Sequence, residues 1–239
     1  MRRFFCDNIA SSTATITGDD AHHICRVLRM KVGDMLSLCD GAGFEYEAVV
    51  TSVSQEAVVC ALGERRPSEV ESPVHVTLFQ CLPKTGKMET IVQKCTELGV
   101  FAVVPVVSAR CVVIPNKDFE KKRERYNRVA LEAAKQSRRA MVPRVEPLAL
   151  LKQINPKAFD LFLVAYEEES GRTLKTALRE ADAPATVAVL IGPEGGLEAD
   201  EVQRLTQSGA TAVSLGKRIL RTETAGMAML AQILYEVEP

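Results

Sequence analysis

The sequence lacks the features of several large protein classes. Its apolar stretches are all too short to cross a bilayer, and the start, MRRFFCDNIASS, has basic residues without a following apolar segment. We therefore expect no membrane span, no secretory signal and a cytoplasmic location. The seven cysteines are odd in number and include no Cys-x-x-Cys pair. This pattern argues against a disulfide framework or a zinc site and favours reduced thiols.

Two common phosphate-binding motifs are also absent. The chain contains neither the P-loop pattern Gly-x-x-x-x-Gly-Lys-Ser/Thr nor the dinucleotide pattern Gly-x-Gly-x-x-Gly. It has no internal repeat and no low-complexity tract. With 239 residues, 46% of them hydrophobic and 26% charged, it has the composition of a globular protein with a substantial core.

The net charge of −1 hides a strong asymmetry along the chain. Residues 117–144 contain ten lysines and arginines against four acids, whereas residues 160–201 contain three basic residues against ten acids. A chain polarised in this way can bind a polyanion locally without being basic overall. The charge alone favours the simpler alternative of a solvated helix face with surface ion pairs.

The first seventy or so residues have the patterns of a β-rich unit. Apolar and polar residues alternate on both sides of the turn Asp40–Gly43, which predicts two paired strands within residues 34–53. Residues 56–62 predict another strand, and residues 10–34 a short strand and a short helical segment. Together they indicate a small barrel or compact sheet. The polar stretch 64–73, which contains two prolines, is the expected linker.

Beyond the linker, strands and helices alternate, which predicts a mostly parallel sheet covered on both faces. For the long basic helix, Asn116 or Asp118 is the expected cap. The predicted strands are 74–82, 100–107, 160–166, 187–192 and 211–216, and the predicted helices are 85–99, 116–140, 170–181, 197–209 and 221–237.

Two glycine-containing loops follow neighbouring predicted strands. The first is GPEGG, residues 192–196, and the second is SLGKRILRTETA, residues 214–225. The carboxyl ends of parallel strands are where such sheets bind ligands, and glycine lets the backbone approach a ligand closely. Glu194 would repel phosphate, so the ligand should be neutral or positive beside it. One such loop would suit a plain turn, whereas two together favour a binding site.

At these loops the chain resembles a known enzyme class. LIGPEGGLEADEV followed by SLGKRILRTETA is similar to the signature pair of SPOUT-class methyltransferases. Within that class the chain resembles the ribosomal RNA small subunit methyltransferase E family, which methylates N3 of a uridine. The stretches MRRFF, HHICRVLRMKVGD, DGAGFEYEA, KTGKMETIVQKCTELGV and EAAKQS agree in order, so the resemblance covers essentially the whole length.

The resemblance implies an α/β fold with two domains. Residues 1–68 would form a PUA-like β-barrel that helps to grip RNA, and residues 74–239 a SPOUT-type parallel sheet with a C-terminal trefoil knot. It also implies a homodimer, S-adenosylmethionine bound in a bent shape at the knot, and 16S rRNA as partner. The knot follows from the resemblance only, because protein chains are generally unknotted and periodicity predicts an open sheet.

The chain departs from the family pattern at two places. Ser108–Cys111 reads SARC where Thr-Glu-Arg-Ser is expected, and Gln136–Arg139 reads QSRR where Gln-Ser-Gly-Arg is expected. The second departure leaves open whether Arg138 or Arg139 does the work of the family arginine.

The cofactor implied by the resemblance needs an apolar slot for its adenine and bare backbone beside it. Leu190, Gly192, Leu215, Ile219, Leu220 and Ala225 suit the slot, and Gly195 and Gly196 suit close backbone approach. The remaining expected cofactor residues are Ile191, Pro193, Glu194, Gly216, Thr222 and Thr224.

Methyl transfer to uridine N3 needs a way to handle the proton on that nitrogen. Either a base removes it, or a cation stabilises the negative charge that spreads onto O2 and O4. Arg221, with Arg138 or Arg139, is the electrostatic candidate. Glu223 is either the base or a cap of the last helix, and the sequence weighs these equally. Glu194 alternatively faces the cofactor or the partner subunit.

RNA binding is expected to use basic residues of both halves, whose phosphate contacts would weaken with salt. Phe4 and Phe5 suit the core better than base stacking. The HHIC stretch does not make up a metal site, so no metal is expected. Lys84, Lys87 and Glu89 begin the helix after the first strand of the second domain. They suit a solvated first helical turn better than the alternative, in which this strand end lines the approach of the RNA. The candidate RNA-binding residues are Arg2, Arg3, His22, Arg26, Arg29, Arg123, Arg125, Arg128 and Arg139.

Two other functions remain open at this point. The same fold could methylate a ribose 2′-O or another base, although the N-terminal match favours uridine N3. A non-catalytic RNA-binding ribosome-assembly factor would have no reason to keep two bare loops. A small-molecule enzyme is disfavoured because it would need no basic stripe.

Overall fold

The computed structural model describes residues 2–84, 86–113 and 119–237, and the chain divides into two compact units. The first unit comprises residues 1–71 and 134–142, and the second comprises residues 72–133 and 143–239. The long helix α3 (Phe119–Ser137) belongs to the second unit except for its last residues. The expected cap of this helix, Asn116 or Asp118, lies outside the described residues.

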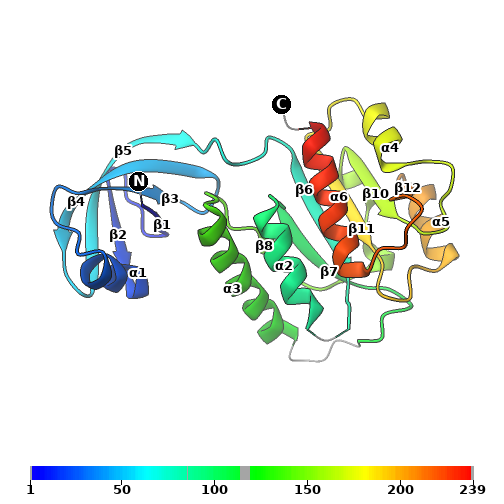
Figure 1. The fold of residues 1–239 in the computed structure, drawn as a ribbon, viewed down its shortest axis with the longest axis horizontal. Helices are drawn as coiled ribbons and strands as arrows, with labels where there is room; N and C mark the ends of the chain where they lie inside the picture. The colour runs from blue at the N-terminus through cyan, green and yellow to red at the C-terminus, as the bar shows by residue number, and fades with distance from the viewer. Residues whose placement is uncertain (1, 85, 114–118, 238–239) are drawn as a thin grey trace. The chain divides into compact units, whose positions relative to one another are not determined.

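The first unit is built on a curled five-stranded sheet (Figure 1). Its strand order is β1-β3-β4-β5-β2, and all neighbours are antiparallel except β1 and β3. The pairing of β5 continues to Pro67, opposite Phe44, so this strand reaches into the stretch that we expected to be linker. The elements are β1 (Arg3–Phe5), β2 (Thr13–Thr17), α1 (Gly18–His22), a π-helix (His23–Val27), β3 (Met35–Cys39), β4 (Phe44–Val53) and β5 (Ala57–Pro67).

Strand alternation gives this sheet its core, and the side chain of Asp40 holds its main turn. Leu36, Leu38 and Val50 are fully buried, and Phe4 is buried with them, as we expected. At the turn between β3 and β4, the Asp40 carboxylate accepts hydrogen bonds from the backbone N–H groups of Ala42, at 2.9 Å, and Phe44, at 3.1 Å. An aspartate that binds the backbone of its own turn is a common way to hold a hairpin.

A buried ion pair holds the segment after α3 within the first unit. The Arg139 side chain is only 5% exposed, and its Nη2 lies 2.7 Å from Oε2 of Glu71. The other oxygen of Glu71 accepts hydrogen bonds from the backbone N–H groups of Ala140, at 2.8 Å, and Met141, at 3.0 Å. A buried pair is stable only when hydrogen bonds satisfy its charges in this way. This pairing corrects our expectation that Arg139 contacts RNA phosphates, because its guanidinium is committed to Glu71.

Helix α3 ends in a Schellman motif centred on Arg138. The N–H of Arg139 donates to the carbonyl of Ala134 at 3.0 Å, and the N–H of Arg138 donates to the carbonyl of Lys135 at 3.4 Å. The motif requires a left-handed residue, and Arg138 has φ +62°. Glycine is the usual residue there, and glycine is what the resembled Gln-Ser-Gly-Arg pattern has. Arg138 therefore takes the glycine position, and Arg139 takes the position of the family arginine.

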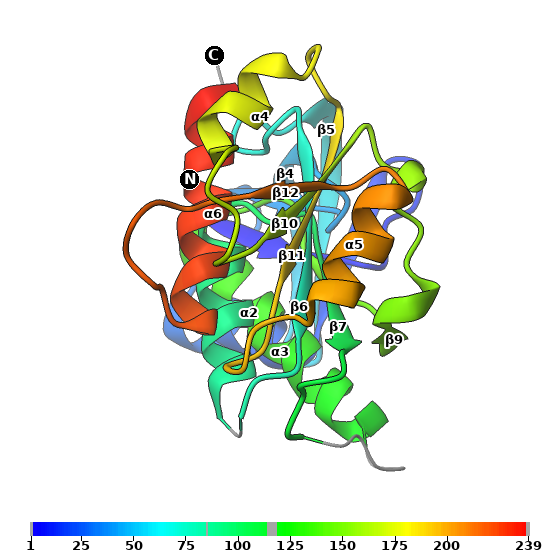
Figure 2. The same cartoon turned by 90° about the vertical axis from the view of Figure 1, so that its right-hand side faces the viewer.

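The second unit is a parallel seven-stranded sheet between two layers of helices (Figure 2). Its main order is β12-β10-β11-β6-β7-β8, with β9 also pairing with β7. All the predicted strands and helices of this unit form, with ends shifted by a few residues. The predicted elements are observed as β6 (His75–Cys81), α2 (Lys87–Glu97), β7 (Ala102–Val107), α3, β10 (Leu161–Ala165), α4 (Leu174–Glu180), β11 (Thr186–Ile191), α5 (Ala199–Gln207), β12 (Thr211–Val213) and α6 (Thr222–Val237). The short strands β8 (Arg144–Val145) and β9 (Ala149–Leu150) and the 3-10 turns at Leu151–Gln153 and Pro156–Ala158 were not predicted.

Successive residues of the central strands face opposite helix layers. Leu163 and Ile191 belong to the core shared with α2, α4 and α6, whereas Phe162 and Leu190 belong to the core shared with α5. Among the described residues, no helix combines the length and apolar composition needed to cross a membrane, and no cluster of three or more His, Cys, Asp or Glu side chains is arranged to hold a metal ion.

We predict that Arg138→Gly stabilises the protein by about 1 kcal/mol, because glycine adopts the left-handed conformation without the steric cost that a side chain incurs. The gain is measured as a higher midpoint of urea unfolding of the full chain. Arg138→Ala is the matched control: it removes the same charge but keeps a Cβ, so it should bring no gain. Equal stabilisation by both variants would mean that charge, and not backbone conformation, sets the cost.

Candidate functional site

A pocket of about 420 Å³ lies where β10, β11 and β12 end at their carboxyl ends. Its walls come from the loops after these strands and from the first turns of α2 and α6. Both glycine-containing loops singled out from the sequence contribute to it. Because β11 and β12 flank β10 on either side, their loops converge on one site.

Most of the expected cofactor residues line this pocket, and three do not. Leu190 faces the α5 layer, one residue out of phase with Ile191, and is fully buried in core. Gly195 and Thr224 also lie outside the lining. The expected cofactor residues that do line the pocket are Ile191, Gly192, Pro193, Glu194, Gly196, Leu215, Gly216, Ile219, Leu220, Thr222 and Ala225, and the catalytic candidate Arg221 lines it with them.

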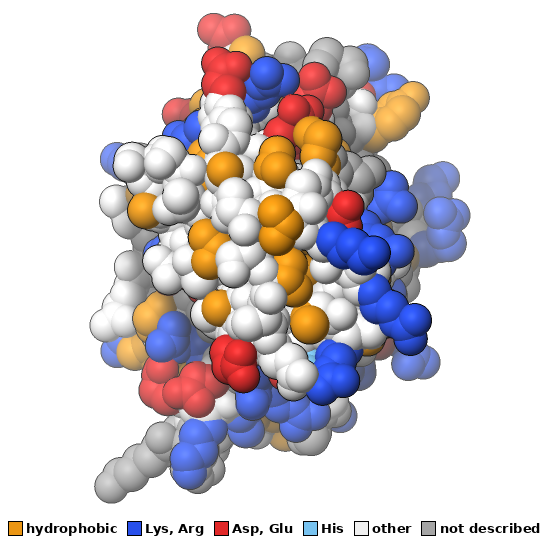
Figure 3. All heavy atoms as spheres, turned by 90° about the vertical axis from the view of Figure 1, so that its left-hand side faces the viewer, with side chains coloured by type: hydrophobic (Ala, Val, Ile, Leu, Met, Phe, Trp, Pro, Cys, Tyr) orange, Lys and Arg blue, Asp and Glu red, His pale blue; other side chains and the backbone are white. Residues whose placement is uncertain are grey.

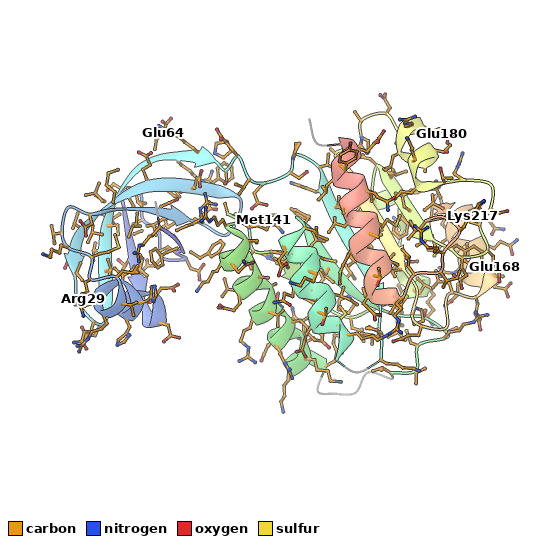
Figure 4. All side chains as sticks on the ribbon, in the orientation of Figure 1. Arg29, Glu64, Met141, Glu168, Glu180 and Lys217 are labelled. Atoms are coloured by element: carbon orange, nitrogen blue, oxygen red, sulfur yellow. The ribbon has the colours of Figure 1, made fainter. Side chains whose placement is uncertain are left out.

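Several lining residues were not expected from the sequence. Ala165 ends β10, and Tyr166 and Glu167 follow it in the next loop. This strand end could have been found with the rule that led to the two glycine loops. Figure 4 labels Glu168 and Lys217, which mark the neighbouring loops that follow β10 and β12. The other unexpected lining residues are Lys87, Ser214 and Arg218.

The first glycine loop needs glycine at position 196 for its left-handed backbone and at position 192 for close packing within the loop. Gly196 has φ +70°, and a Cβ on it would lie 2.1 Å from Oε1 of Glu167. A Cβ on Gly192 would lie 3.2 Å from the carbonyl carbon of Gly196. Glycine at both positions therefore lets the loop fold tightly beside the carboxylate of Glu167.

A buried hydrogen-bond chain joins the loop after β11 to the start of α6. The Gln80 side chain is fully buried, and its Nε2 donates to the Thr222 hydroxyl at 2.9 Å. That hydroxyl in turn donates to the carbonyl of Gly192 at 2.7 Å. The chain holds both loops against β6, the strand that carries Gln80. In this way β6, a strand of the core, fixes two walls of the pocket relative to each other.

The ammonium of Lys87 joins the same two loops from the other side. Its Nζ lies 3.1 Å from Oε1 of Glu194 and 3.0 Å from Oε2 of Glu223, one carboxylate from each loop. We had favoured a solvated first turn for Lys87, and the structure corrects this: the side chain lines the pocket and is 30% exposed. The sequence could not reveal the role because both partners lie far away along the chain.

Both carboxylates that bind Lys87 are held in the charged form. Hydrogen bonds from the backbone of Glu223 itself lower the pKa of that side chain, and Lys87 lowers it further. Burial alone would raise the pKa of Glu194, but the backbone N–H groups of Glu194 and Lys84 and the ammonium of Lys87 outweigh it, so this pKa is also lowered. A carboxylate with a lowered pKa is a weak proton acceptor.

The SARC segment supports the first glycine loop from outside the pocket. Nη1 of Arg110 donates to the carbonyl of Gly195 at 2.9 Å, and the N–H of Ala109 donates to Oε1 of Glu201 at 2.9 Å. Glu201 also closes a capping box with Glu198 at the start of α5. The segment 108–111 therefore contacts both the loop and the helix that follows it.

The expected RNA-binding residues are mostly exposed. In the first unit, Arg2, His22, Arg26 and Arg29 are exposed, and Figure 4 shows Arg29 projecting from its surface. Arg3 is half-buried and paired with Glu45 at 2.6 Å. Figure 3 shows Lys and Arg side chains gathered along one margin of the face in view.

In the second unit, the basic residues lie on α3. Arg123 pairs with Glu120 at 2.7 Å, and Arg125 pairs with Glu89 at 2.8 Å. These exposed pairs agree in part with the simpler interpretation of this charge run as a helix face with surface ion pairs. Arg128 is exposed on the same helix.

The chain matches two domain families. Residues 70–234 match the RNA methyltransferase domain, and residues 16–62 match the RNA methyltransferase PUA domain. Ribosomal RNA small subunit methyltransferase E of Bacillus subtilis is 40% identical over 100% of this chain and 98% of its own length. The Synechocystis protein of the same name is 34% identical over 95% of this chain and 74% of its own length.

A solved structure also matches over nearly the full length. Ribosomal RNA small subunit methyltransferase E from Neisseria gonorrhoeae, bound to S-adenosyl methionine, has a TM-score of 0.80 and 30% identity, and the match covers 99% of this chain and 98% of that one. Sequence, domain composition and fold therefore agree that the chain belongs to the ribosomal RNA small subunit methyltransferase E family.

Proposed function

We propose that this protein transfers a methyl group from S-adenosylmethionine to N3 of a uridine in 16S rRNA of the small ribosomal subunit. The observation that carries the proposal is the pocket formed by the loops after β10, β11 and β12, in a chain of this family. Family membership supports rRNA methylation. The choice of uridine N3 rests on the resemblance of the N-terminal stretches.

The lining combines apolar and charged residues, as S-adenosylmethionine requires. The apolar side chains of Ile191, Leu215, Leu220 and Ala225 suit the adenine ring, and the glycine loop lets backbone groups read its edge. When bound, the cofactor supplies an electrophilic methyl group on a positively charged sulfur. The carboxylate of Glu167 suits that positive charge, because it lies in the lining beside Gly196.

The chemical task of the protein is to position the uridine and to handle its N3 proton. Glu223 is poorly suited as the base, because it is bound to Lys87 and its pKa is lowered. This supports an electrostatic route in which Arg221, exposed in the lining, stabilises the negative charge on the uridine oxygens while the proton leaves to solvent. Arg138 belongs to the first unit and remains a candidate only through its exposed charge.

Several further features belong to the proposal. Residues 1–68 would act as the PUA-like RNA-binding barrel and residues 74–239 as the knotted methyltransferase domain. The knot rests on the resemblance to the family. A homodimer in the cytoplasm is expected from the family, and the exposed Leu98 and Tyr235 supply apolar surface for it on the α2 and α6 side.

The first test is a methyl-transfer assay with the purified chain, labelled S-adenosylmethionine and small ribosomal subunits that lack the modification. We predict label in 16S rRNA and 3-methyluridine in the nucleoside digest by mass spectrometry. A different methylated nucleoside would mean that the protein is a methyltransferase with another target atom. If the protein binds the cofactor but labels neither the subunits nor naked rRNA, the proposal of 16S rRNA as substrate is wrong. If it does not bind the cofactor, the alternative of a non-catalytic assembly factor is favoured.

Arg221→Ala should lower the rate of methyl transfer at saturating substrates by about 100-fold or more, because a cation that acts on the developing charge is lost. Cofactor affinity should change little. The two quantities are measured by single-turnover transfer and by calorimetry. Arg218→Ala is the control, since Arg218 is also exposed in the lining of the same loop. Comparable losses in rate and affinity for Arg221→Ala would contradict the role.

Lys87→Met should weaken S-adenosylmethionine binding by about tenfold, because Glu194 and Glu223 would then repel each other and the two loops would separate. Lys84→Met is the control, since only the backbone N–H of Lys84 contacts Glu194. The double variant Lys87→Met with Glu223→Gln should recover most of the affinity, since it removes the repulsion. Calorimetry measures all three, and a double variant no better than Lys87→Met would rule out this explanation.

A further inference from the structure

Two cysteines, Cys81 and Cys111, lie in or near the segment 108–111, which contacts the first glycine loop. Cys81 ends β6 opposite Val106 of β7, and its side chain is fully buried. Cys111 lies only four residues after β7, and its Sγ is 3.8 Å from the carbonyl oxygen of Val106. Cys111 packs against the buried cluster that contains Cys81, and the same Val106 carbonyl accepts the N–H of Leu82, the residue after Cys81, at 2.9 Å. The proposed methyl transfer uses neither of them.

The surroundings of Cys111 favour its thiolate. Both the N–H and the hydroxyl of Ser108 lie 3.4 Å from its Sγ. The Cys81 thiol, together with these Ser108 groups and the N–H of Leu82, lowers the pKa of Cys111 to about 6, although burial opposes this. The thiol of Cys81 has a pKa well above its usual value, first because of Cys111 and then because of burial. One sulfur is therefore poised as a nucleophile while its neighbour stays protonated.

The thiol pair is connected to the pocket through three consecutive residues. Ser108 contacts the Cys111 sulfur, Ala109 donates to Glu201 at 2.9 Å, and Arg110 donates to the carbonyl of Gly195 at 2.9 Å. A covalent change at Cys111 removes the acceptor of the Ser108 hydrogen bonds. The backbone that holds Gly195 and Glu201 must then adjust.

We propose that Cys111 and Cys81 form an oxidation site for small hydroperoxides, whose disulfide alters the loop at Gly195. The Cys111 thiolate attacks one peroxide oxygen; an S–O bond forms, the O–O bond breaks, and the leaving oxygen takes up a proton as water or alcohol. Cys111 is thereby oxidised to a sulfenic acid and the peroxide is reduced. Cys81 then attacks the Cys111 sulfur; the S–S bond forms, the S–O bond breaks, and hydroxide leaves with the Cys81 proton as water.

The test uses the full-length reduced protein treated with hydrogen peroxide near neutral pH. We expect an intact mass lower by two hydrogen atoms and, after digestion, a peptide that links Cys81 to Cys111. Cys25 is the matched control, because it is a partly exposed free cysteine like Cys111. Cys111 should be oxidised about tenfold faster than Cys25, because the N–H and hydroxyl of Ser108 favour the Cys111 thiolate.

Two variants separate the steps. Cys111→Ser should abolish the disulfide, and Cys81→Ala should leave a sulfenic acid at Cys111 that dimedone traps. If Cys81→Ala does not fold, Cys111→Ser and the peptide map of the wild-type protein still test whether the disulfide forms. Faster oxidation of Cys25, or no linked peptide, would overturn the oxidation site. Because this readout needs no cofactor, it is independent of the proposed methyl transfer.

The coupling to the pocket rests on the proposed function and has its own readout. S-adenosylmethionine affinity is measured by calorimetry before oxidation, after oxidation and after reduction with dithiothreitol. We expect a loss of several-fold that dithiothreitol reverses and that Cys111→Ser does not show. An unchanged affinity in the disulfide form would overturn the coupling. Failure of the reduced protein to bind would instead count against the proposed function.

Discussion

The hydroxyl of Thr222 is the constraint on which the pocket depends. It accepts a hydrogen bond from a fully buried glutamine of the central sheet and donates one to the carbonyl of Gly192. A serine or threonine hydroxyl can do both at once, which a methyl group cannot. Through these two hydrogen bonds, Gln80 of β6 fixes the position of both the last helix and the first glycine loop. Inside a protein, losing either partner leaves a polar group without compensation, so the arrangement has one low-energy geometry.

Ion pairs also hold the two glycine loops together. The two loops bring carboxylates to one place, and a single ammonium from α2 neutralises them enough to let the loops close. Because the charges are only partly exposed, salt screens them less than it would screen surface pairs. The pocket is therefore assembled from the loops after β10, β11 and β12 and the start of α2, which lie in separate parts of the sequence.

The local features of the fold could be predicted from the sequence, because strand alternation, helix spacing and glycine turns act over a few residues. Most strands and helices of the second unit follow from these patterns, and so do the two glycine loops that line the pocket, but the two-residue strands β8 and β9 do not. The partnerships could not be predicted. Gln80 and Thr222 are 142 residues apart, and neither pattern nor charge relates them. Arg139 carries no sign in the sequence that it is buried against Glu71 and not exposed to RNA.

The division of the chain has a consequence for biosynthesis. The first unit takes its final segment, residues 134–142, from beyond the first part of the second unit. Glu71 is made early, yet the guanidinium and the two backbone N–H groups that satisfy its carboxylate come from residues 139–141. A ribosome that has released only the N-terminal sheet has released an incomplete unit. The first unit can therefore reach its native state only after more than half of the chain has emerged.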